Sequence, residues 1–329
     1  MSQVLSRDLL KLDCERATDE ITSWMRDVVH QHMRRKGAVL GISGGIDSSV
    51  CAALAARAFG PERVLGLFTP EGESDKDTLR LSRLAADSQH VTALLEDITP
   101  ILEAAGCYRR RDDAIRAVIP EYTPEWKCKL VLPSVLDDDR YRIYSIVAMS
   151  PDGKQIKKRL PPDAYLGVVA ASNFKQRTRK MIEYFHADRL NHVVIGTPNR
   201  LEYDQGFFVK GGDGLADVKP IAHLYKSQVY QLAEFLGVPA EIRSRPPTTD
   251  TYSLPQGQDE FYFSLSYDKM DVCLYAMNEG HSAEAVAEVL ALTPDQVGRV
   301  FRDIESKRRA ARYLHMPPQL VPNATPVTH

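Results

Sequence analysis

The stretch Ala38-Val39-Leu40-Gly41-Ile42-Ser43-Gly44-Gly45-Ile46-Asp47-Ser48-Ser49 decides the fold of this chain. An apolar run that predicts a strand leads into a Gly/Ser turn, and the residues from Val50 to Phe59 predict a helix. Glycines let the backbone approach an anion, successive N–H groups can point at it, and the dipole of the following helix favours negative charge there. The stretch therefore predicts a phosphate-binding turn between a strand and a helix.

Two common phosphate-binding motifs do not fit this turn. No Gly-Lys-Ser/Thr follows, as a Walker A loop requires, and adjacent glycines with an Asp in the turn do not match the dinucleotide-binding fingerprint. Ser43-Gly44-Gly45-x-Asp47-Ser48 instead resembles the pyrophosphate loop (PP-loop) of the ATP pyrophosphatases, which activate a group by adenylation and release pyrophosphate. The turn alone identifies only that superfamily.

The composition is that of an ordinary globular protein. The chain has 329 residues, 43% hydrophobic and 26% charged, enough for one large domain or two modest ones. Its 42 basic and 44 acidic residues give a net charge of −2, which argues against a dedicated nucleic-acid-binding protein. No apolar run approaches the roughly 20 residues of a membrane span, and the N-terminus has no signal-peptide pattern.

The five cysteines are widely spaced and form no Cys-x-x-Cys pair, so neither a zinc site nor a redox pair is expected. Free thiols in a reducing compartment are the simplest interpretation. We therefore expect a cytoplasmic protein with no membrane and no nucleic acid among its partners.

Strands and helices alternate after the phosphate-binding turn. Apolar runs predict strands at 38–42, 64–68, 91–95 and 192–196, and periodic runs predict helices at 6–35, 48–59, 76–88, 173–185 and 224–236. Alternation of this kind means βαβ units, so we expect an α/β fold built on a doubly wound parallel sheet. The region after residue 267 predicts mostly helix.

One stretch, residues 108–162, breaks this rhythm, and we call it the insertion. It contains Asp152-Gly153 between two alternating segments, 141–149 and 154–160, which is a strong hairpin signal. We expect it to decorate the α/β core. The expected division is 1–107 and 163–260 for the ATP pyrophosphatase domain, 108–162 for the insertion, and 261–329 for a helical C-terminal region and tail.

A second informative block begins where the 192–196 strand ends. It reads Gly196-Thr197-x-x-x-x-Glu202, Gly206-Phe207-Phe208-x-Lys210 and Gly212-Asp213-Gly214. Ligands of open α/β sheets bind at the carboxyl ends of strands, so we expect Glu202 at the same sheet edge as Asp47. Two carboxylates beside a triphosphate suit Mg²⁺, a hard cation that takes oxygen ligands and shares them with phosphates.

The two blocks together resemble ammonia-dependent NAD⁺ synthetases. Further matching elements follow elsewhere: Asn173-x-x-x-Arg177-x-Arg179, Asp217-x-x-Pro220, Leu224-x-Lys226-x-Gln228-Val229, Pro246-Pro247-Thr248 and Lys307-Arg308. The resemblance covers most of the chain outside the insertion. It implies an adenine nucleotide alpha hydrolase-like fold and a ligase that adenylates the carboxylate of deamido-NAD⁺ with ATP. Pyrophosphate leaves, and ammonia then displaces AMP to give NAD⁺.

The resemblance also implies roles for individual residues. Asp47, Ser43 and Lys226 would be catalytic, and Asp47 and Glu202 would bind Mg²⁺. The ATP-binding set would be Gly41, Ser43, Gly44, Gly45, Asp47, Ser48, Arg179, Thr197, Lys226 and Thr248. The set for deamido-NAD⁺ would be Asn173, Arg177, Lys210, Asp217 and Lys307. No protein nucleophile is required, because ammonia is the attacking species.

Departures from the family's pattern lie on the acceptor side rather than the ATP side. Gly211 replaces an aromatic residue, Leu215 a glycine and Ser306 a histidine, and the loop after Thr248 and the insertion also differ. These departures leave open a paralogue that amidates a different carboxylate by the same chemistry. A non-catalytic nucleotide-binding protein is a second alternative, against which the retention of both Asp47 and Glu202 counts.

The resemblance implies partners as well. The family's sites are completed across a homodimer interface, so a homodimer is expected. No glutaminase segment precedes Ser6, so the ammonia is expected to be free or to come from a separate glutaminase.

Overall fold

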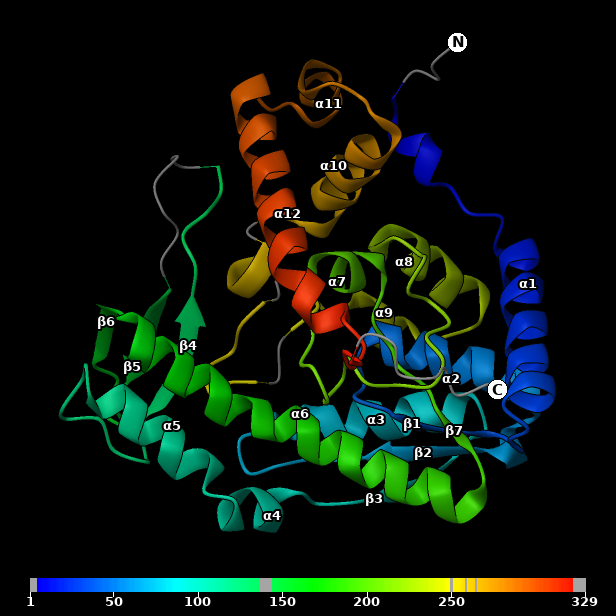
Figure 1. Ribbon diagram of the computed structural model, residues 1–329, viewed down its shortest axis with the longest axis horizontal. Coiled ribbons are helices and arrows are strands. Elements are labelled where there is room, and N and C mark those ends of the chain that lie inside the picture. The colour runs from blue at the N-terminus through cyan, green and yellow to red at the C-terminus, as the bar shows by residue number, and fades with distance from the viewer. Residues whose placement is uncertain (1–4, 137–143, 249–250, 258, 264, 322–329) are drawn as a thin grey trace.

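The computed structural model describes residues 5–136, 144–248, 251–257, 259–263 and 265–321. Its core is a parallel four-stranded sheet in the order β3-β2-β1-β7 (Figure 1). The strands are β1 (Ala38–Gly41), β2 (Val64–Phe68), β3 (Thr92–Leu95) and β7 (Val193–Val194). All four predicted strands are therefore present, and β7 is prolonged by a parallel bridge between Ile195 and Val218.

β1 is one of the two inner strands of this sheet. Ala38 pairs with Val64 on one side and with Val193 on the other. The chain adds strands outward from β1 in both directions, so the strand order reverses beside β1. Open α/β sheets bind ligands at such a switch point, outside the carboxyl ends of the strands. The Gly/Ser turn begins there.

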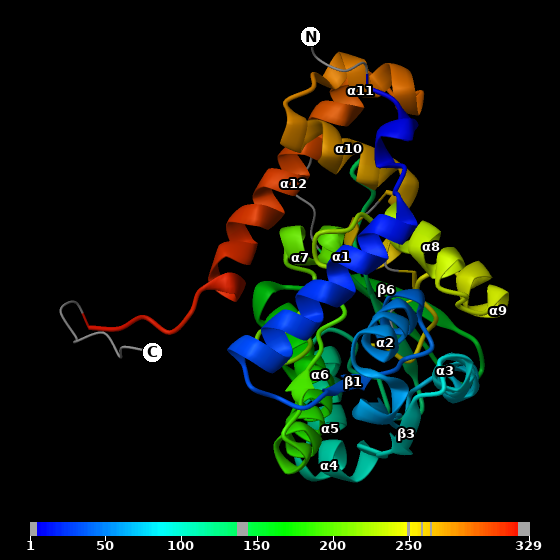
Figure 2. The ribbon, with the colours of Figure 1, turned by 90° about the vertical axis from the view of Figure 1, so that its right-hand side faces the viewer.

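Helices cover both faces of the sheet (Figure 2). The helices α1 (Cys14–Arg26), α2 (Ile46–Phe59), α3 (Lys76–Ser88) and α8 (Lys226–Phe235) form one core with the face that presents Leu40. The long helix α6 (Pro162–Leu190) packs on the opposite face, against Val39. Successive residues of a strand point to opposite faces, which is why the apolar run at β1 serves both cores. The doubly wound α/β fold is confirmed.

The insertion contains most of α5 (Cys107–Arg116) and an antiparallel sheet in the order β4-β5-β6. Its strands are β4 (Lys127–Val131), β5 (Ser145–Met149) and β6 (Gln155–Arg159). The predicted hairpin is β5-β6, with Gly153 at a positive φ of 88° in its turn. Strand β4 was not predicted, since two lysines obscure its short apolar pattern. The proposed division into domain, insertion and C-terminal region stays a prediction.

The C-terminal region is helical, as expected. Helices α10 (Tyr267–Glu279), α11 (Ala283–Leu290) and α12 (Pro294–His315) form most of a second apolar cluster, to which Leu10, Leu201 and Tyr225 also contribute. They stand above the sheet in Figure 1, with the C-terminal end of α12 reaching down toward α6. Shorter helical segments complete the chain: Arg7–Leu10, Asp27–His32, Pro61–Arg63, α4 (Thr99–Ala104), α7 (Arg200–Gln205), α9 (Ala240–Ser244) and Asp259–Phe263.

The N-terminal prediction of one helix over 6–35 is wrong. A 3-10 turn at Arg7–Leu10 is followed by a break, and α1 begins at Cys14. The break occurs because the carboxylate of Asp13 caps α1 by accepting a hydrogen bond from Arg16 N at 3.1 Å. Among the described residues, no helix combines the length and the apolar character needed to span a membrane.

Candidate active site

The Gly/Ser turn has the geometry of an anion cradle. Gly44 has a φ of +72°, and a Cβ there would lie 2.8 Å from Leu81 Cβ, so only glycine fits. Ser48 Oγ accepts a hydrogen bond from Ser43 N at 3.2 Å and donates one to Gly45 O at 3.0 Å, which fixes the turn. Because the N-cap of α2 is Gly45, no cap side chain covers the first amide groups of this helix. An anion at this position can accept hydrogen bonds from them.

Asp47 lies in the first turn of α2 and meets residues from two distant helices. Its Oδ1 accepts a hydrogen bond from Asn199 Nδ2 at 3.1 Å, and its Oδ2 forms an ion pair with Lys226 Nζ at the start of α8. Lys226 is fully buried. The turn from β1, the N-cap of α7 and the first residue of α8 therefore converge on one carboxylate.

Glu202 is held beside Asp47 by the cap of α7. Asn199 N donates to Glu202 Oε2 at 3.1 Å, while Asn199 Oδ1 accepts from Leu201 N and Glu202 N at 3.0 and 3.3 Å. This is a capping box, in which the helix cap also orients the carboxylate. Asn199 thereby joins both predicted metal ligands.

The electrostatics of this group favour an added cation. Burial and the nearby Asp47 carboxylate raise the pKa of Glu202 to about 8. Burial alone would lower the pKa of Lys226, but Asp47 and Glu202 outweigh it and raise that pKa above its ordinary value. The raised pKa of Glu202 reflects the cost of a second negative charge beside Asp47, and a further positive charge would reduce that cost.

The donor set fits Mg²⁺ shared with phosphates. The described residues include no group of three or more His, Cys, Asp or Glu side chains that could hold a metal. Mg²⁺ is commonly bound through one or two carboxylates, with waters and substrate phosphates as its other ligands. Asp47 and Glu202 supply two carboxylates of this kind beside the predicted phosphate turn.

A cavity of about 1150 Å³ opens at the carboxyl ends of β1 and β7. Every residue predicted to bind ATP or metal lines it: Gly41, Ser43, Gly44, Gly45, Asp47, Ser48, Arg179, Thr197, Glu202, Lys226 and Thr248. Asn173, Arg177 and Lys210 from the predicted acceptor set line it too. The fold therefore brings these residues together, although their binding roles stay predictions.

Asp217 and Lys307 are not among the residues that line this cavity. The Asp217 carboxylate accepts hydrogen bonds from Val194 N at 2.7 Å and from the Tyr184 hydroxyl at 3.2 Å. Lys307 Nζ lies 2.6 Å from Asp303 Oδ2 and donates to Tyr262 O at 2.7 Å. In this structure both side chains join elements of the fold, and a role in binding deamido-NAD⁺ stays a prediction for each.

Several polar groups of the site were not predicted. Asn199 precedes Glu202 by three residues, and this capping-box spacing was a signal that could have identified it. Lys180 Nζ and Glu183 Oε2 form a buried ion pair at 2.6 Å in the cavity wall. Asp213 also lines the cavity, and burial raises its pKa. The Lys180–Glu183 pair has the i,i+3 spacing of a helical ion pair, but its place in the cavity wall depends on where α6 crosses the sheet.

A doubly wound sheet with a phosphate-binding turn and paired carboxylates at its switch point defines a nucleotide-binding α/β enzyme. The family model described as NAD synthase matches residues 17–117 and 136–312. The chain belongs to the NAD synthase family, which confirms the family predicted from the sequence.

Curated relatives agree with this family. The chain is 59% identical over 318 residues to the NH(3)-dependent NAD(+) synthetase of Rhizobium meliloti (strain 1021), covering 97% of this chain and 95% of the relative. It is 57% identical over 317 residues to the protein of the same name from Rhizobium rhizogenes (strain K84 / ATCC BAA-868), covering 96% of each.

Solved structures share the fold. NMN synthetase from Francisella tularensis superposes with a TM-score of 0.65 at 21% identity, covering 95% of this chain and 100% of that one. NH3-dependent NAD synthetase from Campylobacter jejuni superposes with a TM-score of 0.61 at 20% identity, covering 94% and 100%. At these identities the likeness concerns the fold alone.

Proposed function

We propose that this chain is an ATP-dependent ligase that forms NAD⁺ from deamido-NAD⁺ and ammonia. The observation that carries the proposal is the convergence of Asp47, Glu202 and Lys226 on the phosphate-binding turn inside one large cavity. Family membership and the names of relatives at 57–59% identity support the same activity.

The first step is adenylation. A carboxylate oxygen of deamido-NAD⁺ attacks the α-phosphorus of ATP, and the bond from that phosphorus to the oxygen bridging to the β-phosphorus breaks. In this proposal the departing pyrophosphate binds at the turn Ser43–Gly45 and at the amide groups that begin α2, where no cap side chain accepts their hydrogen bonds. The Lys226 ammonium offsets negative charge that builds on the phosphates.

The second step forms the amide. The nitrogen of ammonia attacks the acyl carbon of the adenylate, a proton leaves the nitrogen, and the bond from carbon to the AMP oxygen breaks. The protein itself forms no covalent bond with either reactant, so its contribution is to hold both in the cavity and away from water. When bound by Asp47 and Glu202, Mg²⁺ would neutralise phosphate charge.

Pyrophosphate release tests this function. The chain is incubated with ATP, Mg²⁺ and ammonium, with either deamido-NAD⁺, nicotinate mononucleotide or no acceptor. We expect release that depends on deamido-NAD⁺, gives stoichiometric NAD⁺ and stops when EDTA removes the metal. Turnover with the mononucleotide alone would establish the paralogue instead. If the chain binds ATP but releases no pyrophosphate with either acceptor, the ligase function is contradicted.

Free ammonium is proposed as the nitrogen source, and a separate glutaminase remains the alternative. In the same assay we expect ammonium to support turnover and glutamine alone to fail. We also propose a cytoplasmic location, because all five cysteines are free thiols, which suits a reducing compartment. Fractionation of cells that produce the chain tests the location.

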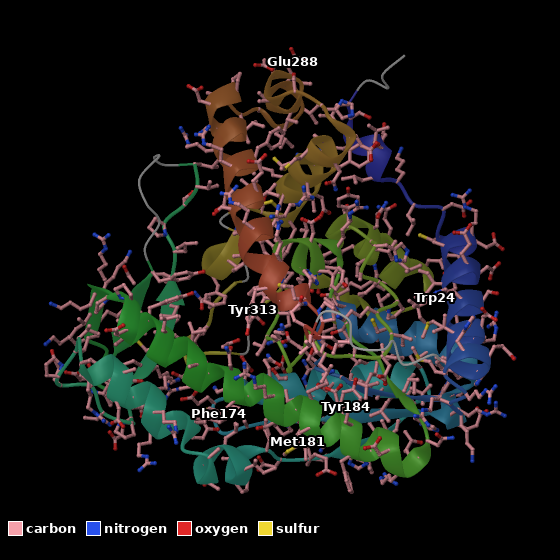
Figure 3. The ribbon with its side chains drawn as sticks, in the orientation of Figure 1. Trp24, Phe174, Met181, Tyr184, Glu288 and Tyr313 are labelled. Atoms are coloured by element: carbon pink, nitrogen blue, oxygen red, sulfur yellow. The ribbon has the colours of Figure 1, made fainter. Side chains whose placement is uncertain are left out.

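A homodimer is proposed through the outer face of α6. Leu166, Met181 and Phe185 are 60%, 54% and 60% exposed there, and helical spacing places Phe174 and Arg177 on the same side. Figure 3 shows Phe174 and Met181 along this outer side of α6. Exposed apolar side chains grouped on one face are typical of a protein–protein interface. A partner on this face would also close the rim of the cavity at Arg177.

A further inference from the structure

A buried cluster of charged side chains joins the insertion to the cavity wall, and the chemistry above does not use it. Arg111 of α5 pairs with Glu73 Oε2 at 2.6 Å and with Asp112 Oδ1 at 2.8 Å. Lys175 of α6 pairs with Glu71 Oε1 and Glu73 Oε2, both at 2.8 Å. The two glutamates belong to the loop between β2 and α3, so three separate parts of the chain meet here.

Lys175 also contacts a residue outside this charged cluster. Its side chain is almost fully buried, and its Nζ donates a third hydrogen bond to the backbone carbonyl of Thr251 at 3.0 Å. An ammonium group has three donors, and here Glu71, Glu73 and Thr251 take all three. The charge cluster is thereby connected to the backbone of segment 251–257.

The edge of β4 holds the same segment from the other side. β4 pairs with β5 along one edge, and its second edge is taken up by segment 251–257. Cys128 N donates to Ser253 Oγ at 2.9 Å, and Leu254 N donates to Cys128 O at 3.0 Å. Gln256 Nε2 donates to Leu130 O. Backbone and side-chain bonds together give the segment a defined position on the insertion.

This segment forms part of the cavity wall. Thr251 and Tyr252 line the cavity, and Tyr252 is buried against Phe261 with their rings 5.7 Å apart. Lys175 itself is not a lining residue but lies on α6 between Asn173 and Arg177, which do line the cavity. By contrast, the hydrogen bonds of Ser43, Asp47 and Ser48 join the turn to itself and to Asn199 and Lys226.

We propose that Lys175 is a positioning residue for the acceptor: with the edge of β4, it fixes segment 251–257 as a wall of the cavity. Through this contact, the insertion shapes the acceptor end of the site, although a bridge between Gly257 and Thr248 also joins the far end of the segment to a predicted ATP-binding residue. The match to the family model leaves out residues 118–135, which contain β4, so this support lies in a part of the chain that the family match does not describe. The inference rests on the proposed function for the identity of the acceptor.

Lys175→Met tests the inference, with affinities for deamido-NAD⁺ and ATP measured separately by calorimetry and KM values measured in the pyrophosphate assay. Without Lys175, segment 251–257 should occupy its position on β4 in only a minor fraction of molecules. We therefore expect the Kd and KM for deamido-NAD⁺ to rise about tenfold. For ATP, we expect both constants to stay within about threefold. The control is Lys127→Ala, an exposed residue of the same strand β4, which should change neither.

Lys175→Met leaves two glutamates short of a partner and can fail to fold, so a milder variant accompanies it. Ser253→Ala with Gln256→Ala removes two bonds to β4 and no buried charge, and we expect the same selective rise. Ser253→Thr combined with Gln256→Ala keeps a hydroxyl at position 253. This variant should therefore retain more acceptor affinity than the double alanine variant. Amide hydrogen exchange over 251–257 should speed up in the weakened variants and not in Lys127→Ala.

Equal rises for ATP and acceptor, or no rise despite faster exchange in the segment, would overturn the inference. Failure of the proposed function is a separate result. A wild-type chain that binds deamido-NAD⁺ but forms no NAD⁺ contradicts the ligase, while the binding comparison still decides the role of Lys175. A wild-type chain that does not bind deamido-NAD⁺ would contradict both.

Discussion

Asp47 shows how much depends on a single carboxylate in this protein. It contacts Asn199 and Lys226, and through Asn199 it is connected to Glu202. Its neighbours therefore define both the charge and the geometry of the predicted metal site.

We expect Asp47→Asn to lower turnover by about 10²–10³-fold, because the neutral amide binds the cation weakly and has no negative charge to pair with Lys226. Pyrophosphate release at saturating ATP and Mg²⁺ is the measurement. Glu288→Gln is the control, since this exposed carboxylate lies on α11 far from the sheet (Figure 3). Turnover of Asp47→Asn within about twofold of wild type would refute the assigned role.

At the scale of elements, the site is built from helix ends. The cap of α7 orients Glu202, and the start of α8 carries Lys226. Asp271 of α10 accepts hydrogen bonds from Lys226 N at 3.1 Å and Ser227 N at 2.6 Å, so a side chain from the C-terminal region caps α8. The C-terminal helices therefore help to place Lys226.

We expect Asp271→Ala to lower the free energy of unfolding by about 1–2 kcal/mol and also to reduce kcat, because the first turn of α8 loses its cap. Urea unfolding and the pyrophosphate assay provide the two measurements. Ser282→Ala is a matched control: Ser282 caps α11 by accepting from Ala285 N at 3.3 Å. The Ser282→Ala variant should have a lower free energy of unfolding but an unchanged kcat. Normal kcat in Asp271→Ala would show that the cap does not position Lys226.

At the scale of the whole molecule, the outer face of α6 is an apolar surface that the described residues of this chain leave exposed. Met181 lies one helical turn from Arg177, which lines the cavity. Assembly and substrate binding are therefore expected to be linked at this face.

We expect wild type to be a dimer at micromolar concentration and Met181→Glu with Phe185→Glu to be a monomer, because burying unpaired carboxylates in an apolar interface carries a large desolvation cost. Light scattering after size-exclusion chromatography gives the mass. Trp24→Glu, on α1, replaces a side chain that is 44% exposed away from α6 and should leave the mass unchanged (Figure 3). A monomeric wild type, or a dimeric double variant, would contradict the proposed interface.

The sequence by itself determined the fold class, the family and the members of the phosphate turn. These rest on local physics: alternating apolar runs, the turn in which only glycine fits at position 44, and the helix that follows it. The order of the two motif blocks was also enough to place Asp47 and Glu202 at one sheet edge, since the carboxyl ends of parallel strands share that edge.

Only the tertiary structure decided which distant groups meet. Lys226 is 179 residues from Asp47, and Lys175 is 76 residues from Thr251, and no local pattern encodes either contact. Strand β4 is likewise defined by a tertiary contact, its antiparallel pairing with β5. Such contacts depend on how helices and sheets pack, and packing is set by the summed burial of the whole chain rather than by any one stretch.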